Sequence, residues 1–231
     1  ELGGNAPFLV FDDADIDAAI EGAMVSKYRN MGQTCVCTNR FYVQAGIHDA
    51  FVEKLTEATR ALQVGDGTTD GITQGPLIDQ DAVDKVEALI NDATAKGGKV
   101  AEGGRRHALG GTFFEPTVIT QATSEMNFAT EEIFGPLSAV FKFDTEDQAI
   151  VAANATEYGL AAYAYTRDVG RIFRINESLE YGLIGINSGL ITTVEAPFGG
   201  MKESGLGNEG GSQGLEDYLE LKYTCIAGLN T

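Results

Sequence analysis

The stretch PFLVFDDADIDAAIEGAMVSKYRN, residues 7–30, decides the fold class because it predicts a buried strand followed directly by a helix. PFLVF is a short, continuous apolar run, typical of a strand covered on both faces. After it, acidic residues crowd the expected helix start, where the helix dipole favours negative charge. The expected apolar side chains of this helix recur at helical spacing, at Ile16, Ala19, Ile20, Met24 and Val25.

Strands and helices alternate in the same way along most of the chain. Further strands are predicted at residues 40–44, 98–101, 136–143, 161–166 and 183–187, and further helices at 48–62, 79–98, 146–156 and 168–179. This alternation indicates an α/β fold, with a largely parallel sheet flanked by helices. No repeat or linker divides it, so we expect one domain over residues 1–218. Residues 219–231 predict a terminal strand with an unpaired edge, which would serve as an oligomerisation element.

Composition excludes several classes of partner. The chain has 231 residues, 43% of them hydrophobic, which is enough for a sizeable core. Its 34 acidic and 16 basic residues give a formal charge of −18, which disfavours binding to nucleic acid or to anionic membranes. No run of eighteen apolar residues and no leader-like segment occurs. With only three cysteines, too few for a disulfide framework, a reducing cytoplasm is the expected location.

Two of those cysteines lie one residue apart in GQTCVCTNR, residues 32–40. Cys35 and Cys37 could be a redox pair, two metal ligands, or a nucleophile and its neighbour. A structural zinc site needs four ligands, and Cys225 offers only one more, so no metal is expected. Cys225 lies in an apolar run and is expected to be buried.

The position of Cys35 favours a nucleophile. It lies in a polar turn just beyond a helix that carries Lys27 and Arg29, and cationic neighbours stabilise the reactive thiolate. A cysteine hydrolase remains open, because His48 or His107 could lie beside Cys35 in the fold. A non-enzymatic thiol redox or interaction module remains open as well.

The stretch GLGNEG, residues 205–210, satisfies the G-x-G-x-x-G pattern of dinucleotide-binding folds. That pattern requires a strand before it and a crossover helix after it, and the flanking residues predict neither. We therefore expect a loop in which the glycines permit left-handed backbone.

Four motifs occur in the order and spacing of aldehyde dehydrogenases. They are ELGGNAP at 1–7, GQTC at 32–35, EEIFGP at 131–136, and NSG followed by PFGGMKESGLG between 187 and 207. The resemblance covers nearly the whole chain, which is similar to the C-terminal, catalytic half of such an enzyme. Within the family, the closing segment and YRNMGQTCVC most resemble succinate-semialdehyde dehydrogenases.

The resemblance implies a covalent mechanism. Cys35 would attack an aldehyde carbonyl, a hydride would pass to NAD or NADP, and the resulting thioester would be hydrolysed. Glu1 would be the general base that activates water, and the backbone N–H of Cys35 would stabilise the oxyanion. Glu132 and Phe134 match the positions that hold the nicotinamide ribose and flank the ring. Without the resemblance, these two would be read as a turn-capping acid and a core aromatic.

The resemblance also implies the substrate. Arg29 would grip the far carboxylate of succinic semialdehyde, and Thr192 replaces a serine of the subfamily while retaining the hydroxyl. Cys37 matches a second cysteine that can form a disulfide with the nucleophile as a redox switch. The full-length enzyme would be a homo-oligomer. The family's dinucleotide-binding half lies upstream of ELGG, so residues 1–231 alone are expected to be inactive.

Overall fold

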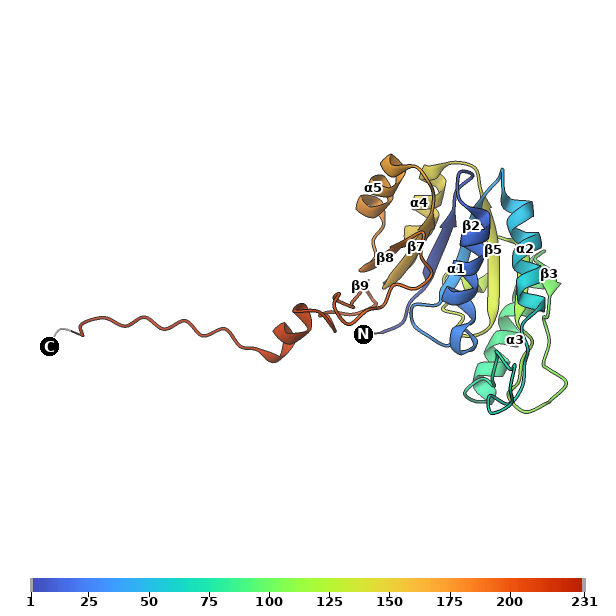
Figure 1. Cartoon of the computed structure of the whole chain (residues 1–231), viewed down its shortest axis with the longest axis horizontal. Helices are drawn as coiled ribbons and strands as arrows, with labels where there is room; N and C mark the ends of the chain where they lie inside the picture. Colours follow the sequence, from blue (N-terminus) through green and yellow to red (C-terminus); the bar gives the residue numbers. More distant parts are fainter. Residues whose placement is uncertain (1, 230–231) are drawn as a thin grey trace.

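A seven-stranded sheet forms the centre of the protein in the computed structural model, which describes residues 2–229 (Figure 1). Every neighbouring pair of strands is parallel except the antiparallel pair β3–β4, which confirms the predicted largely parallel α/β fold. Side by side, the strands are β3 (Lys99–Glu102), β4 (Thr117–Ala122), β5 (Leu137–Phe143), β2 (Thr38–Gln44), β1 (Ala6–Val10), β7 (Ala161–Tyr165) and β8 (Leu183–Ile186).

Helices cover both faces of this sheet. Helices α1 (Ile16–Tyr28) and α2 (His48–Arg60) pack on one face, and α3 (Gln80–Ala95), α4 (Glu146–Asn154) and α5 (Val169–Ser178) pack on the other. Strand side chains alternate between the two cores, so Phe8 and Val10 of β1 point to the first face and Leu9 to the second. Across residues 2–229, no helix is both long and apolar enough to cross a membrane.

Short elements complete the architecture. Strands β6 (Tyr158–Gly159) and β9 (Met201–Lys202) form a small antiparallel pair. Three 3-10 helices are η1 (Arg29–Gly32), η2 (Asn127–Ala129) and η3 (Gln213–Tyr218).

Helix α1 buries smaller side chains than the periodicity predicted. Val25 is 45% exposed, whereas Gly22 and Ala23 are buried against the sheet. A Cβ on Gly22 would overlap the hydroxyl oxygen of Tyr165, so the close approach of helix and sheet selects small residues. The predicted helix was therefore correct, but Val25 was wrongly assigned to its buried face.

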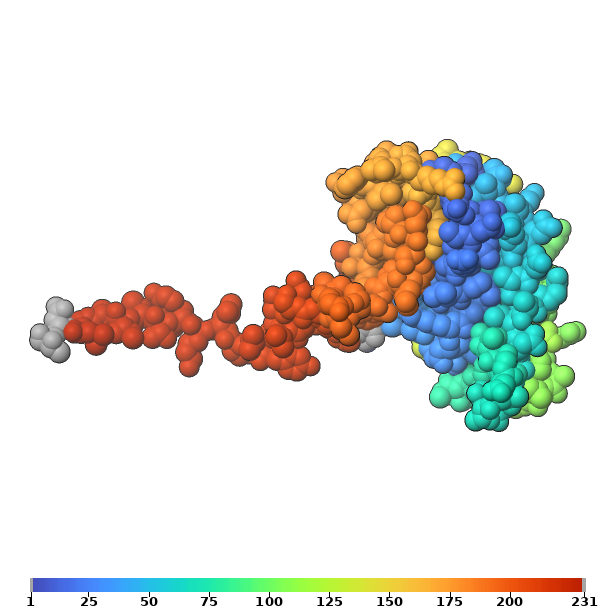
Figure 2. All heavy atoms as spheres, in the orientation of Figure 1, coloured from blue at the N-terminus to red at the C-terminus, as the bar shows by residue number. Residues whose placement is uncertain are grey.

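The C-terminal segment, residues 219–229, extends away from the body of the protein (Figures 1 and 2). Its side chains are exposed, and the described chain provides it with no partner strand. Cys225 is exposed too, so the expectation that it is buried was wrong. The role of this segment as a terminal pairing strand stays a prediction.

Candidate functional site

Three of the four motifs precede three adjacent strands. ELGG precedes β1, GQTC precedes β2, and EEIFGP precedes β5. These strands are parallel neighbours in the order β5-β2-β1, so their amino ends meet at one edge of the sheet, here called the amino edge. The motifs form a hollow of about 450 Å³ there, lined by Leu2, Gly3, Gln33, Thr34, Cys35, Glu132 and Phe134.

The ELGG segment contacts both the cysteine turn and the EEIFGP loop. The N–H of Gly4 donates to Oε1 of Glu132 at 3.2 Å. A Cβ on Gly4 would lie 2.5 Å from the carbonyl oxygen of Cys35, so only glycine allows this approach. Glu1 itself lies outside the described residues, but it directly precedes Leu2, which lines the hollow.

The fourth motif reaches the same place through Ser204, which is fully buried. Its hydroxyl donates to the carbonyl oxygen of Gly3 at 2.7 Å and accepts from the N–H of Gly159 at 3.0 Å. Its carbonyl oxygen accepts from the N–H of Leu2 at 2.9 Å. Ser204 therefore fixes the residues that follow Glu1, a role that the sequence did not reveal.

A strained turn presents Cys35. Between α1 and GQTC, Asn30 and Met31 have φ values of 51° and 58°, a left-handed backbone that non-glycine residues rarely adopt. After the turn, the N–H of Cys37 donates to the carbonyl oxygen of Thr34 at 2.8 Å. Cys35 is half-buried and Cys37 is buried, and no disulfide joins them.

Tyr163 of β7 holds the residue between the two cysteines, because its hydroxyl donates to the carbonyl oxygen of Val36 at 2.7 Å. The tyrosine is fully buried, and burial raises the pKa of its hydroxyl. Tyr163 therefore remains protonated and keeps donating at neutral pH. Nothing in its sequence context indicated this contact, since 127 residues separate the partners.

Two cationic residues, Lys27 and Arg29, lie near Cys37, and neither is among the residues that line the hollow. Lys27 is 1% exposed, and burial lowers the pKa of its ammonium to about 8, although Cys37 and Glu132 act in the opposite direction. Arg29 is half-buried, and its Nε is a buried donor with no hydrogen-bond partner among the described residues. An unused guanidinium donor suits an anionic ligand.

Glu132 and Phe134 lie in the EEIFGP loop that faces Cys35 across the hollow. Both line the hollow with Cys35, and Phe134 is 40% exposed instead of being a core residue. The φ of Phe134 is 48°, so this bulky residue also adopts a left-handed backbone. An acid that can accept from hydroxyl groups, beside an exposed ring, fits the ribose and ring of a nicotinamide nucleotide.

Other predicted residues do not join this hollow. Thr192 is exposed in the loop after β8 and is not among the residues that line the hollow. Neither His48 nor His107 lines it: His48 contacts Asp49 at 2.8 Å, and His107 lies in a separate surface hollow. Among residues 2–229, no three His, Cys, Asp or Glu side chains cluster as a metal site would require.

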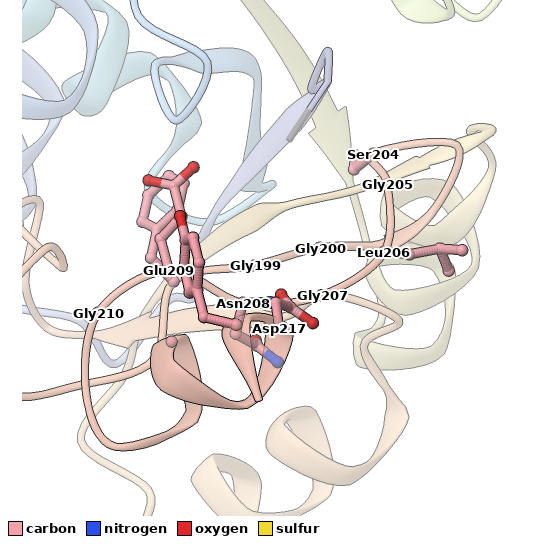
Figure 3. Close-up of a pocket in the computed structure, with 13 residues that line it drawn as sticks. Gly199, Gly200, Ser204, Gly205, Leu206, Gly207, Asn208, Glu209, Gly210 and Asp217 are labelled. Atoms are coloured by element: carbon pink, nitrogen blue, oxygen red, sulfur yellow. The ribbon is translucent and has the colours of Figure 1, made fainter. Parts of the chain in front are cut away.

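The GLGNEG stretch forms part of a different hollow, of about 340 Å³ (Figure 3). Gly205, Gly207 and Gly210 have positive φ values, which confirms the predicted loop. The two-residue strand β9 precedes the loop and the 3-10 helix η3 follows it, so a dinucleotide-binding strand and helix are not formed here. A carboxylate oxygen of Asp217 accepts from the N–H of Asn208 at 3.3 Å and braces the loop.

The model of the aldehyde dehydrogenase family matches residues 1–224. The chain belongs to the aldehyde dehydrogenase family. Two curated relatives are a 3-sulfolactaldehyde dehydrogenase of Pseudomonas putida and a glutarate-semialdehyde dehydrogenase of Pseudomonas aeruginosa. Each is 59% identical to this chain, over 100% and 99% of its length respectively. The crystal structure of a succinate-semialdehyde dehydrogenase from Burkholderia pseudomallei, also 59% identical, covers 99% of this chain with a TM-score of 0.98.

The resemblance to aldehyde dehydrogenases inferred from the motifs is thereby confirmed, including the similarity to succinate-semialdehyde dehydrogenases. The chain spans about half the length of the curated relatives it matches, 47% in both cases, and 47% of the solved structure.

Proposed function

We propose that this chain provides the catalytic domain of an NAD(P)-dependent aldehyde dehydrogenase that oxidises succinic semialdehyde to succinate. The observation that supports this most directly is the meeting of ELGG, GQTC and EEIFGP at one hollow, with the thiol of Cys35 among them. A candidate nucleophile and a candidate cofactor-binding acid then line one hollow, and the proposed base directly precedes Leu2 of that hollow in the sequence.

The proposed reaction begins when the thiolate of Cys35 adds to the aldehyde carbon and forms a carbon–sulfur bond. The backbone N–H of Cys35 stabilises the oxyanion of the thiohemiacetal. Bound NAD or NADP supplies the hydride acceptor for the oxidation to a thioester. Glu1 then takes a proton from water, which attacks the thioester carbon and releases the acid and the Cys35 thiolate. Glu132 and Phe134 orient the nicotinamide ribose and ring.

The substrate assignment rests on charge. The three relatives named above are dehydrogenases of 3-sulfolactaldehyde, glutarate semialdehyde and succinate semialdehyde, and each name denotes a short aldehyde with an acid group at its other end. A protein of charge −18 needs a local cation to hold such an anion, and Arg29 offers a buried donor with no described partner. We assign the carboxylate contact to Arg29 and a supporting hydroxyl to Thr192.

The competing activities lack comparable support. A cysteine hydrolase needs a histidine beside its nucleophile, and neither His48 nor His107 lines the Cys35 hollow. A purely redox or interaction module would leave the convergence of the three motifs unexplained. By resemblance, we also propose a cytoplasmic homo-oligomer in which residues 219–231 pair between subunits.

The test uses the full-length protein that contains these residues, with succinic semialdehyde and uncharged butanal as substrates and NAD or NADP as cofactor. Reduced cofactor should form with both aldehydes, with a lower KM for the semialdehyde. Cys35→Ala should lower kcat by at least about a thousandfold. Arg29→Met should raise the semialdehyde KM by roughly tenfold or more and leave the butanal KM nearly unchanged. Equal effects of Arg29→Met on both aldehydes would refute the carboxylate assignment.

A further inference from the structure

Asn39 is a buried polar residue that none of the family motifs contains. It lies four residues after Cys35, near the start of β2, and is 2% exposed. Its neighbour Asn5, just beyond ELGG, is 1% exposed. Burial of two amide side chains requires that their hydrogen-bonding groups find partners.

The partners of Asn39 lie on both sides of Glu132. Its Oδ1 accepts from the N–H of Ile133 at 2.7 Å, and its Nδ2 donates to the carbonyl oxygen of Glu131 at 3.2 Å. The same Nδ2 donates to the carbonyl oxygen of Phe128 at 2.9 Å. The amide therefore brackets Glu132 through the backbone of its two neighbours.

Asn5 fixes the orientation of this amide. The Nδ2 of Asn39 donates to Oδ1 of Asn5 at 2.7 Å, and the Nδ2 of Asn5 donates to the carbonyl oxygen of Ala129 at 3.2 Å. The guanidinium of Arg40 donates to the backbone carbonyl of Asn5 at 2.7 Å. The pair of asparagines thus connects all three segments, namely the one after ELGG, the one after GQTC and the 127–133 segment.

The loop that they hold is under strain. Phe134 follows Ile133 directly and has a φ of 48°, which a bulky side chain adopts only when its surroundings impose it. The bond from Ile133 to Asn39 is the restraint nearest to Phe134 along the chain on its amino-terminal side. Loss of that bond would free the loop to leave the position in which Glu132 and Phe134 line the hollow.

We propose that Asn39 is a positioning residue for the cofactor: it holds Glu132 and Phe134 in place and couples that loop to the segment that carries Cys35. This inference rests on the proposed function, in which those two residues contact the nicotinamide nucleotide. It predicts that Asn39 affects cofactor binding much more than the reactivity of the thiol.

The test compares Asn39→Leu and Asn39→Asp with Thr38→Val in the full-length protein. Asn39→Leu removes every bond, whereas Asn39→Asp keeps the acceptor for Ile133 and presents a carboxylate to the carbonyls of Phe128 and Glu131. Thr38 is the matched control, because its buried hydroxyl bonds to Ser26 at 2.8 Å and not to the loop. Titration with NADH and NADPH, followed by nucleotide fluorescence, gives the dissociation constant. Alkylation of Cys35 by iodoacetamide reports thiol reactivity.

Both Asn39 variants should raise the dissociation constant of the nucleotide about tenfold. The rate of Cys35 alkylation should stay within about twofold of that of the parent. Thr38→Val should bind like the parent. If Asn39→Leu does not fold, Asn39→Asp and Asn5→Asp give the same comparison. Unchanged nucleotide binding in a folded variant would overturn the inference. A parent that binds neither nucleotide would instead overturn the proposed function.

Discussion

The two edges of the sheet use polar residues in opposite ways. At the carboxyl ends of β1, β5 and β7, charged side chains pair with each other, and Arg171 contacts Asp13 at 2.7 Å and Glu146 at 2.9 Å. At the amino edge, side-chain amides and hydroxyls bind backbone groups instead, as Asn39 and Ser204 do. One edge is closed by ion pairs, whereas the other surrounds a hollow.

Strained backbone also occurs beside the amino-edge hollow. Asn30, Met31 and Phe134, three of the six described non-glycine residues with positive φ, lie in the amino-edge turns next to Cys35 and Glu132. Ligands of open α/β sheets usually bind outside the carboxyl ends of the strands. Here ion pairs join Asp13, Glu146 and Arg171 across that edge, and the candidate site occupies the opposite one. The carboxyl edge therefore contributes stability, whereas the amino edge holds the candidate site.

Gly4→Ala should cause the largest loss of activity among these variants while leaving the overall fold intact. The new Cβ would lie 2.5 Å from the carbonyl oxygen of Cys35, so ELGG or the cysteine turn must shift. A displacement near 1 Å is expected to lower kcat/KM about a hundredfold. Gly75→Ala is the matched control, because its Cβ would meet no atom within 4 Å. Steady-state kinetics of both variants check this, and equal rates would show that the contact is dispensable.

Glu146→Gln should affect stability and leave the reaction unchanged. Hydrogen bonding to Arg174, supported by Arg171, lowers the pKa of Glu146 from its ordinary 4.5 to about 2. The folded pKa lies below the unfolded one, so the stabilisation is complete above about pH 4.5 and is lost as the pH falls toward 2. After allowance for solvent screening, the free energy of unfolding of the variant should be about 1–2 kcal/mol lower than that of the parent at pH 7.

Denaturant unfolding between pH 7 and pH 3 measures this loss. The difference in unfolding free energy between parent and Glu146→Gln should shrink as the solution becomes more acidic. Glu125→Gln serves as the control, since Glu125 is exposed and has no ion pair in the described part of the chain. A stability difference that does not vary with pH, or a tenfold loss of kcat, would contradict the division between the two edges.

Hydrophobic periodicity predicted the fold well, because both faces of the sheet are buried and its strands are continuous apolar runs. It missed β4, whose sequence TVITQA mixes threonines with apolar residues. It also placed Val25 on the wrong face of α1, since close packing against Tyr165 favours glycine and alanine there. Local sequence does not report how closely two elements approach.

The site was predictable to the extent that its residues lie in recognisable motifs. The placement of Cys35, Glu132 and Phe134 around one hollow agrees with the roles inferred from resemblance, which stay proposals. Asn39 and Tyr163 could not be found in this way, because the bonds that define them span 94 and 127 residues. A polar residue at the start of an apolar strand, such as the asparagine of TNRFYVQ, is the one signal that the sequence offered.

Substitution of Cys37 should have the smallest effect on kcat/KM under reducing conditions. It also tests the geometry of the amino edge most directly. Its thiol is buried, and its N–H closes a turn to Thr34 while Tyr163 holds Val36 between the two cysteines. A disulfide between Cys35 and Cys37 must distort this turn, because it would close a ring across a single intervening residue. The bond would therefore form reversibly and remove the nucleophile.

With thiol present, Cys37→Ala should keep kcat/KM within about twofold of the parent, since alanine fills a similar small buried position. Hydrogen peroxide should inactivate the parent, two thiols being oxidised as the peroxide is reduced to water, and dithiothreitol should restore it. In Cys37→Ala the oxidised Cys35 has no neighbouring thiol, so recovery should fall as exposure lengthens and the sulfur passes to its sulfinic form. Recovery of the variant as complete as that of the parent would show that the strained turn around Cys35 excludes the second thiol from its chemistry.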